Sequence, residues 1–273
     1  MAFVQPSDGA LNYFLCHYGR SRLTYRGPRR DLSGEYLAVL GGTETYGRFV
    51  MAPYAALVEE RLGIPVANLG CQNAGPDVYL CDRGAMEVAA GARVAVLQVM
   101  GAQNLTNRYY TVHPRRNDRF VAATPLLRSM YREVDFTEFH FTRHLISALW
   151  ALGEERFAPI RAELKLLWVE RMIAILARLP KRSILFWTAD HPPPEGDAGP
   201  EIQPMFVDRA MIEVLKPHAS AYVEHVVTPA ARAEGLSAMR FLPQEEPAAE
   251  GLPGAAVHQE AADRLMPLVE RLL

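Results

Sequence analysis

Short apolar runs alternate with amphipathic segments between residues 36 and 100, and the alternation resumes at residue 183. The apolar runs predict buried strands at residues 36–40, 64–69, 93–100, 183–188 and 221–227. The amphipathic segments predict helices at residues 53–62, 77–90, 206–215 and 257–273. Strand, helix and strand in succession predict a parallel sheet with right-handed crossovers, because parallel neighbours need a long connection.

The alternation of predicted strands and helices is interrupted between residues 104 and 180. Phe157, Ile160 and Leu164 follow a helical stripe there, Pro180 ends it, and no strand is predicted. We therefore predict an α/β fold: a three-layer α/β/α sandwich with a flavodoxin-like parallel sheet and a helical cap inserted at 104–180. Residues 1–35 form an irregular leader, and the 273 residues are expected to fold as a single domain.

Composition narrows the class of protein. The formal net charge is −2, which argues against a general nucleic-acid binder. Three cysteines without metal-site spacing favour reduced thiols over a disulfide framework. No stretch approaches the roughly 18 apolar residues of a membrane span, and the first residues lack a secretory pattern. We expect a cytoplasmic protein without a membrane partner.

The turn at residues 41–47 is the most informative segment, because the first strand runs there into two glycines, two threonines and a carboxylate. Thr43, Glu44 and Thr45 follow Gly42 at the start of a short helix, where backbone N–H groups stabilise negative charge. In the alternative interpretation, the glycines only permit a tight turn and close packing. The spacing matches neither a dinucleotide fingerprint nor a P-loop, so we expect no nucleotide cofactor.

Three further segments end or begin elements on the same side of the predicted sheet. Residues 68–70 follow the second strand, residues 100–104 follow the third, and residues 257–258 open the last helix. The carboxyl ends of parallel strands share one crevice, so all four segments are expected to face the same cavity.

These four segments resemble the blocks of the SGNH, or GDSL-like, hydrolase superfamily, which supply serine, glycine, asparagine and histidine in that order. Thr43 falls at the nucleophile position of the first block, and Gly70 falls in the second. In the third block, GxND, Gln103 stands at the oxyanion asparagine and Asn104 follows it. The fourth block, DxxH, aligns with residues 255–258 and keeps His258 without its aspartate.

The resemblance implies an ester hydrolase or acyltransferase that acts on an O-acylated, anionic or carbohydrate-like small molecule. It implies Thr43 as nucleophile, His258 as base, and Gly70 with Gln103 or Asn104 as oxyanion donors. The γ-methyl group of Thr43 crowds its hydroxyl, and no acid precedes the histidine. Glu44 and Asp190 are the carboxylates expected to reach the crevice.

Two other functions fit the same residues. The first is an inactive pseudo-hydrolase that binds a glycan, another ligand or a protein partner. The second is a transferase that holds a phosphate or sulfate donor in the glycine turn, with Glu44 or His258 as base.

A basic and aromatic segment follows the third strand at residues 107–120. Arg108, Arg115 and Arg116 are expected to clamp an anionic substrate, with tyrosines stacking on sugar rings. The alternative is a solvated loop whose arginines pair with nearby acids, among them Glu133. Nucleic acid is not expected as a partner, because the whole chain is nearly neutral.

Two histidine-containing motifs carry weaker signals. Asp190 and His191 come directly after the fourth strand, where they form either a proton-transfer pair or a polar turn. His140 and His144 have the spacing of two metal ligands on one helical face, but no third ligand is evident. We therefore predict no metal.

Overall fold

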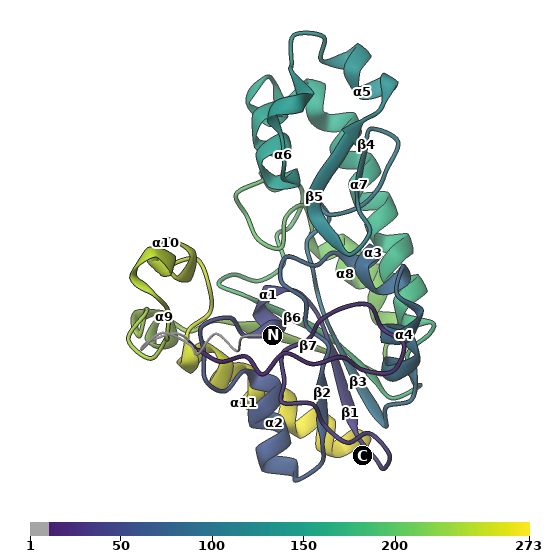
Figure 1. Ribbon diagram of the computed structural model, residues 1–273. Coiled ribbons are helices and arrows are strands. Elements are labelled where there is room, and N and C mark those ends of the chain that lie inside the picture. The colour runs from purple at the N-terminus through teal and green to yellow at the C-terminus, as the bar shows by residue number, and fades with distance from the viewer. Residues whose placement is uncertain (1–10) are drawn as a thin grey trace, which may run out of the picture.

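The computed structural model describes residues 11–273, and a five-stranded parallel sheet forms its centre (Figure 1). The strands are β1 (Leu37–Leu40), β2 (Val66–Asn68), β3 (Val94–Gln98), β6 (Ser183–Ala189) and β7 (Ala221–Val226). Their order is β2-β1-β3-β6-β7, and every neighbouring pair is parallel. This is the predicted flavodoxin-like sheet. Residues 1–10 of the predicted leader lie outside the described residues.

Helices cover both faces of the sheet, because successive strand residues point to opposite sides. In β1, Leu37 and Val39 pack on one side, while Ala38 and Leu40 pack on the other. The first side is covered by α2 (Tyr54–Leu62) and α11 (Ala255–Leu272). The second is covered by α3 (Pro76–Leu80), α4 (Arg83–Ala90), α7 (Glu154–Leu176) and α8 (Arg209–Leu215). The predicted three-layer sandwich is confirmed.

The cap segment between β3 and β6 differs from its prediction. It contains an antiparallel hairpin of β4 (Tyr110–His113) and β5 (Arg116–Ala123). The prediction of no strand there was wrong, because polar residues break the apolar alternation of β5 and a hairpin needs only local pairing. Around it lie α5 (Pro125–Met130), the 3₁₀ turn η1 (Phe136–Glu138) and α6 (Thr142–Ala151). Figure 1 shows these elements projecting beyond the sheet.

Two other segments depart from the predicted boundaries. The helix expected at 77–90 is divided into α3 and α4, because the Asp82 side chain accepts the Ala85 N–H and starts a new helix. Residues 243–253 are acidic and contain prolines, a composition that predicts a surface loop, but they form the 3₁₀ turn η3 (Pro243–Glu245) and α10 (Glu246–Ala249). The remaining short elements are α1 (Thr43–Tyr46), the 3₁₀ turn η2 (Lys216–His218) and α9 (Pro229–Ala233).

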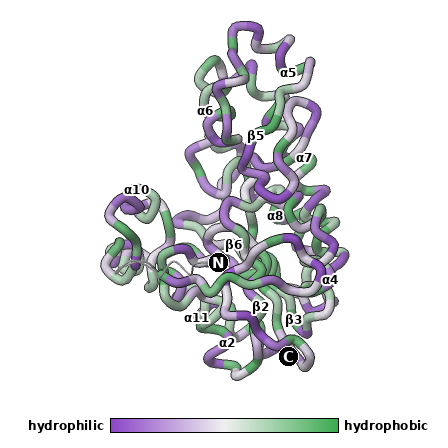
Figure 2. The backbone as a smooth tube through the Cα atoms, in the orientation of Figure 1, coloured by the Kyte–Doolittle hydropathy of each residue, from purple (hydrophilic) through white to green (hydrophobic). Residues whose placement is uncertain are grey.

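The hydropathy of the chain follows this layering, with apolar strands at the centre and mixed helices around them (Figure 2). Within residues 11–273, no helix is both long and apolar enough to cross a membrane.

Helix α7 runs from the cap segment to the flank of the sheet, and Trp168 anchors it there. Its side chain is fully buried, and the indole N–H donates to the Met100 carbonyl at 2.8 Å, just beyond β3. The end of the central strand is therefore tied directly to the helix that carries the cap.

Replacing this anchor should lower the free energy of unfolding. Trp168→Ala is expected to cost about 3–5 kcal/mol in chemical denaturation, because it leaves a cavity in the core. Leu166→Ala on the same helix is the matched control: that side chain is 61% exposed, and its loss should stay within about 0.5 kcal/mol. Equal losses in the two variants would contradict the anchoring role.

Candidate functional site

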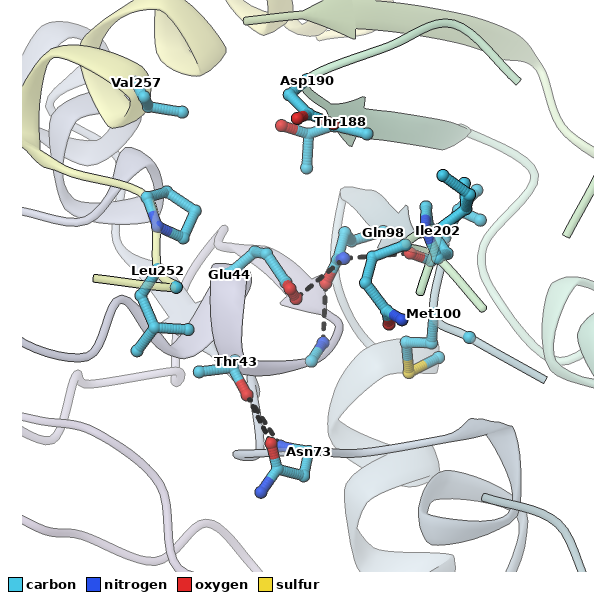
Figure 3. A pocket seen from close by; sticks show the side chains of 18 of the residues that line it. Thr43, Glu44, Asn73, Gln98, Met100, Thr188, Asp190, Ile202, Leu252 and Val257 are labelled. Atoms are coloured by element: carbon cyan, nitrogen blue, oxygen red, sulfur yellow. Dashed lines mark hydrogen bonds between the residues drawn. The ribbon is translucent and has the colours of Figure 1, made fainter. Parts of the chain in front are cut away.

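A cavity of about 1150 Å³ opens at the carboxyl ends of β1, β3 and β6 (Figure 3). Its wall comes from residues 42–44, 73–74, 98–101, 103–104, 141–144, 188–191, 201–204, 231–232, 235–236 and 250–254, with Asp118, Val227 and Val257. Of the predicted site residues, it includes Gly42, Thr43, Glu44, Gln103, Asn104 and Asp190. The predicted crevice at the strand ends is present, although not every predicted residue reaches it.

Gln98, the last residue of β3, holds the glycine turn in place. Its Oε1 atom accepts the Gly42 N–H at 2.6 Å and the Thr45 hydroxyl at 2.9 Å. Its Nε2 group donates to Glu44 Oε2 at 3.2 Å and to the following carbonyl at 2.9 Å. A Cβ atom on Gly41 would lie 2.3 Å from Oε1, so the turn approaches this closely only because a glycine stands there.

Gln98 is absent from the residues predicted above, although the sequence carries a signal for it. It is a polar residue at the end of an otherwise apolar central strand, and it is only 2% exposed. A buried amide of this kind must find partners, and the glycine turn supplies them. The consequence is that Glu44 is held in position at the cavity (Figure 3).

The Thr43 hydroxyl is bonded to Asn73, from the loop after β2. The Asn73 N–H donates to Thr43 Oγ1 at 2.8 Å, and the Thr43 hydroxyl donates to Asn73 Oδ1 at 3.2 Å (Figure 3). Asn73 has a φ of +54°, in the left-handed region that asparagine tolerates better than most residues. Asn73 is therefore a site residue that the sequence alone did not reveal.

His258 lies in the first turn of α11, away from the cavity wall. Its Nδ1 atom accepts the Tyr54 N–H at 3.2 Å, and the two rings stack with centroids 5.9 Å apart. Within residues 11–273, no hydrogen bond joins His258 to Thr43 or to a carboxylate, and its buried Nε2 has no partner. Burial, followed by the charges of Arg26 and His225, lowers the pKa of His258 to about 3.

The stretch before α11 that does reach the cavity is residues 250–254. Glu250 and Pro253 have the acid-to-histidine spacing of the fourth block, as do Ala255 and His258. Proline carries no titratable group, so this stretch brings no histidine to the wall, and its one titratable side chain is the carboxylate of Glu250. Figure 3 shows Leu252 and Val257 directed toward the cavity on this side.

The structure places Gly70 and Thr45 away from the cavity wall, contrary to the predicted four-block arrangement. The Gly70 N–H donates to Asn68 Oδ1 at 2.9 Å, and a Cβ atom on Gly70 would lie 2.4 Å from the Tyr46 nitrogen. Gly70 therefore allows close packing against α1. The Thr45 hydroxyl is fully buried between Gln98 and Tyr54.

Gln103 and Asn104 both line the cavity, but they differ in their hydrogen bonding. The Asn104 amide donates to the Asn73 carbonyl at 2.7 Å, and its oxygen accepts the Thr142 hydroxyl. That side chain therefore supports the loop that holds Thr43. The Gln103 Oε1 atom is buried and has no hydrogen-bond partner.

The predicted arginine clamp does not reach the cavity. Arg108 forms an ion pair with Glu163 on α7 at 2.7 Å, because that buried carboxylate needs a cation. Arg115 and Arg116 are exposed at the hairpin connection, outside the wall. The charged wall residues are the acids Glu44, Asp118, Asp190, Glu201 and Glu250, the arginines Arg143 and Arg232, and two histidines. This excess of acids disfavours an anionic ligand.

The two histidine motifs have separate positions. Asp190 and His191 line the cavity, with His191 Nε2 3.7 Å from Asp190 Oδ1. His144 lies on the wall, whereas His140 is exposed outside it. The described part of the chain holds no group of three or more side chains placed to bind a metal.

The sheet order and the strand-end cavity define an α/β sandwich with a ligand-sized pocket. The chain belongs, over residues 1–273, to the family described as "Domain of unknown function (DUF6473)". A search of curated proteins finds no match.

Solved structures of similar shape include a carbohydrate esterase family 2 enzyme from Myceliophthora fergusii, with 9% identity, 90% of this chain and 68% of that chain covered, and a TM-score of 0.45. A mutant acetylxylan esterase from Geobacillus stearothermophilus has 17% identity and a TM-score of 0.39, and the match covers 87% of this chain and 94% of that chain. An extracellular lipase from Streptomyces rimosus has 10% identity and a TM-score of 0.40, and the match covers 88% of this chain and 100% of that chain. The activities in these names belong to those proteins.

The buried His258 should make stability depend on pH. The unfolded chain protonates this histidine near pH 6.5, whereas the folded protein keeps it neutral to about pH 3. Stability is therefore lost as the pH falls through this window, by up to about 1.4 kcal/mol per pH unit from this group.

We expect His258→Asn, which retains an acceptor and does not titrate, to flatten that dependence between about pH 6 and pH 4 in urea unfolding. His140→Gln, at an exposed histidine, is the control and should keep the wild-type slope. An unchanged slope in His258→Asn would show that the histidine is accessible to protons in the folded protein.

Proposed function

We propose that this protein binds a neutral, polyhydroxylated, carbohydrate-like ligand in the strand-end cavity, and that Thr43 acts there as a hydrogen-bonding group. The observation that carries the proposal is the state of Thr43. Its hydroxyl is bonded to Asn73, and the histidine expected as its base lies in the core against Tyr54. A nucleophilic threonine needs a base within hydrogen-bond reach.

The polar groups of the wall suit sugar hydroxyls. Glu44 offers carboxylate acceptors, and the amide side chain of Gln103 lies on the same wall. The apolar side chains of Met100, Ile202 and Leu252 line the same space and give a sugar ring a face to pack on (Figure 3). Such a mixture of apolar surface and few oriented polar groups is typical of small-molecule sites.

The charge of the wall separates this proposal from the transferase alternative. A phosphate or sulfate donor needs cations or free N–H groups, yet acids outnumber arginines on the wall. The Gly42 N–H, which a phosphate would need, is already donated to Gln98. A neutral ligand avoids both obstacles.

Ligand binding is tested by isothermal titration calorimetry with xylo- and cello-oligosaccharides and their acetylated forms. Glu44→Ala should weaken binding by about ten- to a hundredfold, because each hydrogen bond to a charged group contributes about 1.5–3 kcal/mol. Arg116→Ala, outside the cavity, should leave affinity unchanged. Wild-type protein that binds none of these sugars, or an Arg116→Ala variant that alone loses binding, would contradict the proposal.

The role of Thr43 is tested by removing its methyl group. If Thr43 only bonds to ligand and Asn73, Thr43→Ser should not raise hydrolysis of p-nitrophenyl acetate or acetylated xylose, because the serine still lacks a base. A rise of tenfold or more that disappears in the Thr43→Ser, His258→Asn double variant would show that the pair can act together.

A further inference from the structure

A second hydroxyl on the cavity wall, that of Thr188 at the end of β6, is bonded to a buried histidine. Thr188 Oγ1 lies 2.9 Å from His225 Nδ1, in β7. His225 Nε2 in turn lies 3.3 Å from Glu260 Oε2, in α11. Three separate elements therefore bring a hydroxyl, an imidazole and a carboxylate into one hydrogen-bonded series, and Thr188 at its end is a residue of the cavity wall (Figure 3).

The carboxylate fixes the direction of these bonds. An ionised carboxylate only accepts, so His225 Nε2 carries the hydrogen that is donated to Glu260. In the neutral ring Nδ1 is then an acceptor, and the Thr188 hydroxyl must be the donor. His225 Nδ1 is thus placed to accept the proton of the Thr188 hydroxyl. The hydroxyl of Thr43 has no such base bonded to it.

Neighbouring residues hold these three side chains in place. His225 is 1% exposed and stacks on Phe186 with ring centroids 6.4 Å apart. Glu260 also accepts from the N–H and the hydroxyl of Thr228, which fixes its carboxylate. A group positioned in this way loses little freedom on reaction.

The charges around His225 favour a neutral ring that can take up a proton. Burial lowers the pKa of His225, and Glu260 partly opposes this, while the charge of Arg264 adds to the lowering. His258, whose pKa is itself lowered in part by His225, is another titratable neighbour. His225 is therefore a free base at neutral pH, and Glu260 stabilises the imidazolium once it forms.

We propose that Thr188, His225 and Glu260 form a nucleophile, base and positioning carboxylate that transfer the acyl group of an O-acylated ligand bound in the cavity. This inference rests on the proposed function, because the same cavity must hold the ligand. It assigns acyl transfer to a hydroxyl other than Thr43.

The reaction balances with water as the only co-reactant. Thr188 Oγ bonds to the acyl carbon while its proton passes to His225 Nδ1. The ester C–O bond breaks, and His225 returns the proton to the leaving alkoxide. Water then attacks the acyl-threonine and gives a proton to His225, which passes it to Thr188 as the carboxylic acid leaves.

The test compares wild-type protein with Thr188→Val and Thr188→Ser on p-nitrophenyl acetate and acetylated xylo-oligosaccharides. Thr188→Val should lower kcat at least about 100-fold, because it removes the nucleophile, whereas Thr188→Ser should retain activity. Peptide mass mapping after a brief incubation should find one acetyl group on Thr188 in the wild type and none in Thr188→Val.

Two further variants separate chemistry from packing. Glu260→Gln should lower kcat and move the acid limb of its pH profile to lower pH, because the carboxylate no longer supports protonated His225. Gln259→Ala removes an exposed amide from the same helix, outside the cavity wall and the Thr188–His225–Glu260 network, and it should keep both the wild-type kcat and the acetyl group on Thr188.

Equal rates in wild type and Thr188→Val, with no acetyl group on Thr188, would overturn this inference. Calorimetric binding of the oligosaccharides in the same samples would then leave the proposed function standing. Acetylation of Thr188 in a protein that binds no oligosaccharide would instead overturn the proposed ligand class. It would still support acyl transfer by Thr188, His225 and Glu260.

Discussion

The buried amide of Gln98 determines the geometry of the site. It stands at the end of the central strand β3 and bonds to the turn after β1, so two neighbouring strands are joined where the cavity opens. The close approach of Gly41 leaves the turn little room to rearrange. Each of its bonds contributes about 0.5–1.5 kcal/mol, but losing the amide would leave buried donors unpaired, which costs more. The position of Thr43 against Asn73 follows from this constraint.

The sequence was sufficient to predict the sheet and its layers, because the buried strands are apolar runs and the helices between them are amphipathic. It did not reveal the hairpin of the cap segment, since β5 carries charged residues among its apolar ones. Short strands that pair only with each other leave a weak trace in the pattern of hydrophobic residues.

The site was harder to predict than the fold, because spacing alone does not say which side chain faces a cavity. Two stretches, ending at Pro253 and His258, have the same length, and α11 begins early enough to bury the histidine against Tyr54. Asn73 was equally hidden, since its role depends on a left-handed backbone conformation that the sequence does not display. The chain of Thr188, His225 and Glu260 joins three elements separated in sequence, so only the folded structure brings it into view.

We propose that Thr43 is not activated by a base, since its hydroxyl is bonded to Asn73. Covalent labelling with a fluorophosphonate probe, followed by peptide mass mapping, tests it most directly, because the probe reports which hydroxyl is nucleophilic. We expect no adduct on Thr43 at any pH at which the protein is folded. An adduct on Thr43 that is lost in His258→Asn would contradict it.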